Sequence, residues 1–378
     1  MHRVRLPGTH RAVPPETTWE RVEPRLRHYG ITRVADITRL DNIGIPVFLA
    51  VRPASQTLAV SQGKGASPLL ARLSAVMESI ELWHAEHPAL STFVAKPMCL
   101  GLPYAMTDLN LRVTGNWVSQ LDLPWVQARS LLDDCHIPVP LDLVRLSYSG
   151  EHFWRPRLFE SSSTGLASGN TFAEACLHGL YEAVERDVLA AHPSRKDARR
   201  LRIAPGRVRD EHLRSLMNRL TDAGVEFDIS CIPNRFGIPT FAALVWSPLF
   251  PIVCAGSGTH MDPVVALSRA LTEAVQSRLT EISATRDDIP STQDTWRDAC
   301  ADPGFPATPG LSFDEALHGH SADFDDMEEE LAHVTRCIRD VTGHGPMAVL
   351  LSDPSEPFSV VRVVCPGLAY SEGRTLTA

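Results

Sequence analysis

The sequence has no long run of apolar residues, no paired cysteines and no excess of positive charge. Nothing in it approaches the ~18 consecutive apolar residues that a membrane-spanning helix requires. The basic opening MHRVRLPGTHR is not followed by the apolar core of a secretory signal. We therefore expect a cytoplasmic protein with no membrane partner. Its 378 residues are 44% hydrophobic and 21% charged, as in an ordinary globular protein.

The cysteine and charge patterns exclude two further classes of function. The eight cysteines form no C-x-x-C pair, so neither a zinc site nor a dithiol redox motif is indicated. The formal net charge is −9, whereas a nucleic-acid-binding surface should be basic. We expect no nucleic acid partner. An acidic balance also suits a protein that holds metal ions on carboxylates.

Common signatures of nucleotide and hydrolase sites are also missing. The stretch SQGKGAS is not a Walker A loop, because Gly65 stands where Ser or Thr is required and no glycine precedes it at the required spacing. No G-x-G-x-x-G lies between a strand and a helix with an acidic partner, and G-x-S-x-G is absent. Any nucleotide site must therefore be unconventional.

Residues 171–187, TFAEACLHGLYEAVERD, predict a helix with a one-sided acidic face. At about 100° per residue, Glu174, Glu182 and Glu185 lie within roughly 80° of one another. A solvated helix usually mixes Lys or Arg with Glu, because like charges at this spacing repel, yet this segment has no Lys or Arg before Arg186. The face is either simply solvated or holds a cation.

Two other parts of the chain predict the same order of strand, small-residue loop and helix. GIPVFLAV at 44–51 and GIPTFAALV at 237–245 are alike, and a second strand, a glycine-rich loop and a helix follow each. SSSTGLASGN at 161–170 and CAGSGTHMDP at 254–263 are interpreted as small-residue loops that lead into helices.

The helices that follow these loops share the pattern E-x-[I/V]-[E/Q]. Aligning ARLSAVMESIE with ALSRALTEAVQ matches Glu78 to Glu273 and Glu81 to Gln276. A single GKG stretch is usually a turn, and one E-x-x-E pair is more often a solvated face. The threefold recurrence strengthens both signals. We predict an α/β (α+β) fold in which pseudo-repeated strand–loop–helix units surround a central site.

Converging acidic helices would require a counter-charge. Several carboxylates cannot all stay ionised in a dry pocket without compensation. Mg²⁺ provides it, because this ion prefers carboxylate oxygens together with water and phosphate oxygens. Backbone N–H groups at helix starts bind phosphates, and Lys64, Arg186, Arg278 and Arg286 can neutralise the rest of a triphosphate. The pattern thus suits Mg²⁺ bound together with a triphosphate.

Three long motifs together resemble the YcaO family. They are QGKGAS with SAVMESIE, then STGLASGNTFAEACLHGLYEAVERD, then GSGTHMDPVVALSRALTEAVQSRL with ISATRDD. They fall within 61–86, 161–187 and 255–288; we place the family domain at 60–378, with residues 1–60 continuous with its core. The resemblance implies activation of a peptide backbone amide with ATP and Mg²⁺, in which a nucleophile adds to the carbonyl and its oxygen is phosphorylated.

The resemblance also implies which residues form the site, although it identifies no catalytic residue. The implied Mg²⁺ ligands are Glu78, Glu81, Glu174, Glu182, Glu185 and Glu273. The implied contacts to nucleotide or phosphate are Lys64, Ser74, Asn170, Arg186, Gln276, Arg278 and Arg286. Thr164 stands where the family often has Asn, and His178 matches no role that we can assign.

The kind of product is left open. The ending EGRTLTA lacks the Pro-rich tail common in azoline-forming members. The opening resembles TfuA-partnered thioamide-forming enzymes and standalone enzymes of the bottromycin type. We favour a sulfur nucleophile that gives a thiazoline or a thioamide, with amidine formation by an amine as the nearer alternative. A non-catalytic, nucleotide-dependent scaffold is the competing class. Expected partners are a precursor peptide, a TfuA-like protein and a second copy of the chain in a homodimer.

Overall fold

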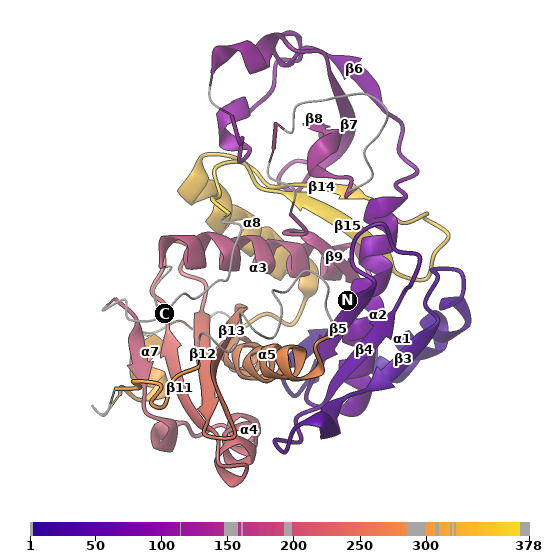
Figure 1. The fold of residues 1–378 in the computed structure, drawn as a ribbon. Helices are drawn as coiled ribbons and strands as arrows, with labels where there is room; N and C mark the ends of the chain where they lie inside the picture. Colours follow the sequence, from indigo (N-terminus) through magenta and orange to yellow (C-terminus); the bar gives the residue numbers. More distant parts are fainter. Residues whose placement is uncertain are drawn as a thin grey trace.

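The computed structural model (Figure 1) describes residues 3–370, except for 114, 147–157, 160–161, 193–198, 286–298, 307–309, 318–319 and 321–322. The helices of this part are α1 (Pro15–Val22), α2 (Pro68–Glu86), α3 (Phe172–Ala191), α4 (Glu211–Asp222), α5 (Pro263–Ser283), α7 (Phe313–Leu317) and α8 (Met327–Thr342). The strands are β1 (Val4–Leu6), β2 (Thr9–Arg11), β3 (Arg33–Asp36), β4 (Val47–Val51), β5 (Val60–Lys64), β6 (Phe93–Ala95), β7 (Leu123–Ser130), β8 (His136–Pro140), β9 (Leu166–Gly169), β10 (Leu201–Ile203), β11 (Glu226–Cys231), β12 (Thr240–Ser247), β13 (Phe250–Thr259), β14 (Met347–Leu350) and β15 (Ser359–Val364). The mixed α/β fold that the sequence predicts is confirmed.

Two of the units have the same topology. Strands β3, β4 and β5 form an antiparallel sheet against α2, and β11, β12 and β13 form an antiparallel sheet against α5, with β10 added at its edge. The register pairs Phe48 with Gly63 in one sheet and Phe241 with Gly258 in the other. These are the segments that the two GIP motifs align, so the alignment of the sequence corresponds to a structural repeat.

The third unit uses strands from distant parts of the chain. Strand β9 leads into α3 and pairs with β15, which comes from the C-terminal part of the described chain. This sheet has the order β6-β7-β14-β15-β9, with β8 on β7, and α3 contacts its strands β9 and β15 as well as α8. In the other two units the partner of the strand before the helix comes earlier in the sequence: β4 pairs with β5, and β12 with β13. The partner of β9 is β15, which comes later. Sequence comparison alone therefore detects this copy less well.

Glycines let the strands lie directly on their helices. A Cβ on Gly63 would come within 2.0 Å of the Ala75 nitrogen and 2.3 Å of the Ala71 carbonyl oxygen. A Cβ on Gly258 would come within 2.1 Å of the Ala266 carbonyl oxygen. Because Ala71 and Ala266 are aligned positions, the same close approach occurs in both units.

The same geometry corrects an expectation about the glycine-rich stretches. Residues 254–259, which we expected in a loop, belong to β13, and residues 166–169 form β9. Glycine and other small residues occur there because the strand touches its helix, whereas a loop interpretation assumes that glycine marks a turn.

The three units form a closed ring. Helix α2 contacts β9, α3 contacts β13, and α5 contacts β5, so each helix touches a strand of another unit. Figure 1 shows these three helices around the middle of the molecule. No helix in the described part of the chain has the length and apolar character needed to cross a membrane. The ring places the acidic helix faces next to one another.

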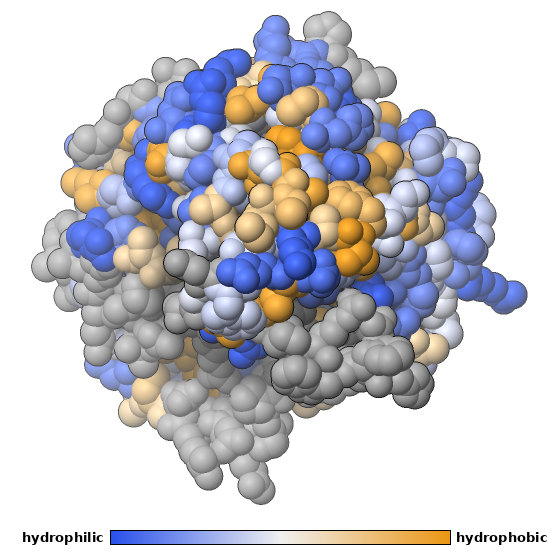
Figure 2. Space-filling model, turned by 90° about the horizontal axis from the view of Figure 1, so that it is seen from above, coloured by the Kyte–Doolittle hydropathy of each residue, from blue (hydrophilic) through white to orange (hydrophobic). Residues whose placement is uncertain are grey.

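Apolar side chains are exposed near β6. Seen from above, this end of the molecule has apolar residues among hydrophilic ones (Figure 2). Val94, Met98 and Trp117 are exposed there, and the short helical turns that carry Met98 and Trp117 contact each other. Exposed apolar residues are common on globular proteins, so this surface by itself identifies no partner.

Candidate active site

Equivalent positions on the three central helices each form a hydrogen bond to a strand of a neighbouring unit. The pairs are Ser168 hydroxyl to Glu81 (2.5 Å), Ser257 hydroxyl to Glu185 (2.7 Å), and Gln276 Nε2 to the Gln62 carbonyl oxygen (3.3 Å). The three helix residues of these pairs are the ones that end the shared E-x-[I/V]-[E/Q] pattern. The acidic faces therefore meet where the units join.

Electrostatics shows that these carboxyl groups affect one another. Burial raises the pKa of Glu81 to about 8, and the charges of Glu78 and Glu182 add to the shift. Burial and the charge of Glu273 raise the pKa of Glu185 to about 7, against the attraction of Arg186. Carboxyls from all three helices thus share one partly desolvated region.

Two cations partly balance this negative charge. Lys64 Nζ, at the end of β5, donates a 2.6 Å hydrogen bond to Glu273 of α5. Burial opposes ionisation of Glu273, but Lys64 and Arg186 outweigh it and lower the pKa of this carboxyl. Arg186 Nη2 lies 3.8 Å from Glu182. Lys64 and Arg186, both predicted to bind phosphate, therefore lie beside carboxylates of the central helices.

The carboxyl cluster suits a magnesium ion that is also bound by phosphate. The raised pKa values of Glu81 and Glu185 show that negative charge is unfavourable here, and a divalent cation would relieve this. Across the described residues, no three acidic, histidine or cysteine side chains are close enough to hold an ion by themselves. Mg²⁺ commonly takes one or two carboxylates and completes its octahedron with water and phosphate oxygens. The donor set fits that mode.

Glu174 has a different set of neighbours from the other acidic residues of α3. Its Oε2 accepts hydrogen bonds from the backbone nitrogens of Ala12 (3.0 Å) and Asn170 (3.2 Å), and Arg11 Nη1 lies 3.5 Å from Oε1. Thr18 donates its hydroxyl to Asn170 Oδ1 at 2.9 Å. Glu174 thus holds the N-terminal segment against α3. Sequence reasoning missed Arg11 and Thr18, because no local pattern around them indicates a site.

Other predicted nucleotide contacts are placed less favourably. Arg278 has a side chain only 2% exposed; it donates to Asp41 Oδ2 at 2.7 Å and to the Phe250 carbonyl oxygen. A nucleotide contact would require breaking this buried ion pair, which is costly. Ser74 is half-buried on α2, one turn before the acidic pair of that helix. Arg286 lies outside the described residues.

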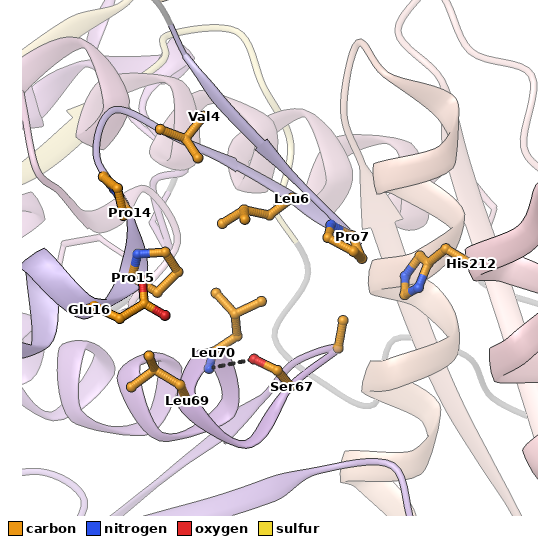
Figure 3. A pocket seen from close by; sticks show the side chains of 11 residues that line it. Val4, Leu6, Pro7, Pro14, Pro15, Glu16, Ser67, Leu69, Leu70 and His212 are labelled. Atoms are coloured by element: carbon orange, nitrogen blue, oxygen red, sulfur yellow. Dashed lines mark hydrogen bonds between the residues drawn. The ribbon is translucent and has the colours of Figure 1, made fainter.

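A cleft opens beside the loop that follows Lys64. It has a volume of about 420 Å³ and lies between the N-terminal hairpin β1–β2, α1 and the start of α2 (Figure 3). Its lining includes Val4, Leu6, Pro14, Pro15, Leu69 and Leu70, with the polar groups of Glu16, Ser67 and His212. Mostly apolar walls with a few polar groups are typical of small-molecule sites.

Comparison with known proteins agrees with this geometry. The model of the YcaO family, described as a cyclodehydratase that binds ATP and Mg²⁺, matches residues 62–369. An uncharacterised protein of Mycobacterium tuberculosis is 37% identical over 96% of this chain and 83% of its own length. A protein encoded in the tfuA 3′ region of Rhizobium leguminosarum bv. trifolii is 36% identical over 95% of this chain and 88% of its own length.

A solved structure shares the fold. It is YcaO from Methanopyrus kandleri bound with AMPPCP and Mg²⁺, with a TM-score of 0.74 and 21% identity over 98% of this chain and 95% of that one. Because the family model spans most of the sequence, and relatives above 30% identity cover almost all of it, this chain belongs to the YcaO family.

Proposed function

We propose that this chain uses ATP and Mg²⁺ to phosphorylate a backbone amide oxygen in a ribosomally made peptide. The observation that carries the proposal is the meeting of acidic side chains from three helices beside Lys64 and Arg186. The description of the family as an ATP- and Mg²⁺-binding cyclodehydratase supports it. So does the bound AMPPCP and Mg²⁺ of the Methanopyrus kandleri protein.

The residues divide into metal-binding and phosphate-binding sets. We assign Mg²⁺ to Glu78, Glu81, Glu182 and Glu185. Glu273, which accepts a hydrogen bond from Lys64, is a further ligand. When bound, Mg²⁺ would neutralise phosphate oxygens and stabilise the charge that develops in phosphoryl transfer. Lys64 and Arg186 attract the same phosphates. Glu174 and Asn170 instead position the N-terminal segment, which brings Arg11 to the site.

The proposed reaction begins with addition to the amide carbon and ends with loss of phosphate. A thiolate adds its electron pair to the amide carbon, and the carbonyl oxygen takes the terminal phosphoryl group of ATP as ADP leaves. Phosphate then departs with the C–O bonding electrons. If the thiolate belongs to a cysteine of the peptide, loss of the amide proton gives the C=N bond of a thiazoline. If it is sulfide, loss of the sulfur-bound proton gives the C=S bond of a thioamide.

A TfuA-like partner is part of the proposal. The relative from Rhizobium leguminosarum bv. trifolii is encoded in a tfuA 3′ region, which supports such a partner and a sulfur nucleophile. We also propose a homodimer, and use of ATP would place the activity in the cytoplasm. Light scattering of the purified chain, alone and with the TfuA-like protein, tests both assemblies.

Mass spectrometry tests the reaction. The protein is incubated with Mg·ATP and a candidate precursor peptide, with and without sulfide and the TfuA-like protein. Loss of the mass of one water identifies a thiazoline or an amidine. Exchange of one oxygen for one sulfur identifies a thioamide. Glu185→Gln provides the inactive control, and release of ADP is measured in parallel.

The same assay can contradict the proposal. Binding of Mg·ATP with no change in peptide mass under any of these conditions would support the non-catalytic scaffold. A product that forms equally well without ATP would exclude amide phosphorylation.

A further inference from the structure

A histidine next to the acidic cluster links two of the units directly and the third through Ser168. His178 lies on α3, one turn before Glu182. Its Nε2 accepts a hydrogen bond from Nη2 of Arg269 on α5, and its ring interacts with the backbone of Ser168 in β9. The Ser168 hydroxyl in turn donates to Glu81 of α2. His178 of α3 thus contacts both α5 and strand β9, and β9 in turn donates a hydrogen bond to the acidic face of α2.

The surroundings keep this histidine neutral. Burial lowers the pKa of His178 well below its usual value, and the charges of Arg269, Arg11 and Lys64 lower it further. Only a neutral ring has a lone pair on Nε2 that can accept a hydrogen bond from a guanidinium. Because Nε2 is the acceptor, the ring proton resides on Nδ1.

The guanidinium of Arg269 lies between charges of both signs. Burial lowers its pKa to about 10, and the neighbouring Arg11 also lowers it, whereas Glu185 and Glu273 raise it. A partly exposed arginine in this position is repelled from one side and attracted from the other. Its orientation therefore depends on a fixed acceptor, because guanidinium hydrogen bonds are directional.

We propose that His178 is a positioning residue of the nucleotide site, whose Nε2 holds Arg269 so that its charge faces Glu185, Glu273 and the phosphates bound beside them. The inference rests on the proposed function, since it assumes that a nucleotide occupies this site. It assigns roles to two residues outside the carboxylate cluster. His178 acts only through Arg269.

Calorimetric binding of Mg·AMPPCP tests this coupling. His178→Ala and Arg269→Ala should each weaken binding about tenfold, the loss expected for one charge-assisted hydrogen bond. The double variant should bind about as weakly as either single variant, because both changes remove the same interaction. His178→Gln should restore most of the affinity, since its amide oxygen can replace Nε2 as the acceptor.

Matched controls separate positioning from folding. His333→Ala removes a histidine of α8 that contacts Cys337, and Arg207→Ala removes an exposed partner of Glu315. Both controls should bind Mg·AMPPCP like wild type. Thermal unfolding of each variant, measured without nucleotide, should change little. Nitrogen NMR of the ring should identify the Nδ1-protonated form of His178.

Specific results would overturn the inference. They are wild-type affinity in His178→Ala, losses that multiply in the double variant, no rescue by His178→Gln, or a proton on Nε2. If wild type itself fails to bind Mg·AMPPCP, the proposed function fails as well. A wild type that binds normally beside an unaffected His178→Ala would overturn the role of His178 alone.

Discussion

Glu174 and Glu185 lie on one face of α3, but they have different neighbours. Glu174 accepts backbone hydrogen bonds from Ala12 and Asn170, as a structural carboxylate does. Glu185 accepts one hydroxyl and lies beside Glu273, with its pKa raised to about 7. A shared helix face therefore does not imply shared surroundings.

Neutralising the central carboxylates should remove activity without unfolding the protein. Glu182→Gln and Glu185→Gln keep the side-chain size but lose the charge that binds Mg²⁺, so we expect kcat for ATP turnover to fall at least ~100-fold. The Tm should stay within about 2 °C, because each change also removes a buried like charge. Steady-state ADP release and calorimetry measure both quantities. A folded Glu185→Gln variant with full turnover would show that this carboxylate is structural.

Stabilisation by Mg²⁺ should increase with pH. The pKa of Glu81 is about 8 in the folded state and that of Glu185 about 7, both above the ordinary 4.5. The folded protein therefore binds these protons more tightly than the unfolded chain, and stability decreases as pH rises from about 4.5 towards about 8. Mg²⁺ replaces the protons and removes the penalty.

Thermal unfolding with Mg²⁺ and with EDTA checks this dependence. The rise in Tm caused by Mg²⁺ should be larger near pH ~8 than near pH ~6. Glu81→Gln should reduce the difference between the two conditions. An equal rise at both values of pH would contradict the assignment of these carboxyls as metal ligands.

At the scale of elements, contact between strand and helix determines where glycine is required. Strand β5 lies on α2 and β13 lies on α5 so closely that a Cβ at Gly63 or Gly258 would overlap helix backbone. Backbone cannot move aside as the end of a flexible side chain can. The equivalent glycines thus keep the acidic helices at the right distance from the strands of the ring.

Alanine at one of these glycines should be strongly destabilising. We expect Gly63→Ala to lower the free energy of unfolding by about 2–4 kcal/mol, because β5 and α2 must move apart. Gly206→Ala is the matched control, since nothing lies within 4 Å of the added Cβ. Urea unfolding measures both variants. Equal stability of Gly63→Ala and Gly206→Ala would show that the strand can shift at little cost.

At the scale of the whole molecule, the site belongs to all three units. Lys64 of one unit donates to Glu273 of another, and Ser257 donates to Glu185 of the third. N-terminal residues add to it through Ala12 and Glu174. The site is complete only when the ring is closed.

Nucleotide should therefore stabilise the protein as one cooperative structure. Differential scanning calorimetry of the full chain should show one main transition that moves to higher temperature with Mg·ATP. At 100 times Kd the gain would be about 2.7 kcal/mol. Two transitions, of which only one responds to Mg·ATP, would show that a single unit carries the site.

Much of the site can be predicted from sequence because its pattern is local and repeated. The spacing of Glu182 and Glu185 defines one helix face, and the recurrence of E-x-[I/V]-[E/Q] predicts that three such faces belong together. The structure brings Lys64, Glu81 and Glu273 to the same region. Helical periodicity predicts which residues share each acidic face, since residues three and four apart lie on one side of a helix.

Only the tertiary structure decides which segments far apart in the chain contact one another. Arg278 follows the motif of α5 closely, yet its side chain pairs with Asp41, because five residues after Glu273 it lies on another side of the helix. Arg269 and His178 meet although 91 residues separate them. Local periodicity determines the face on which a residue lies, whereas packing of the units determines what that face meets.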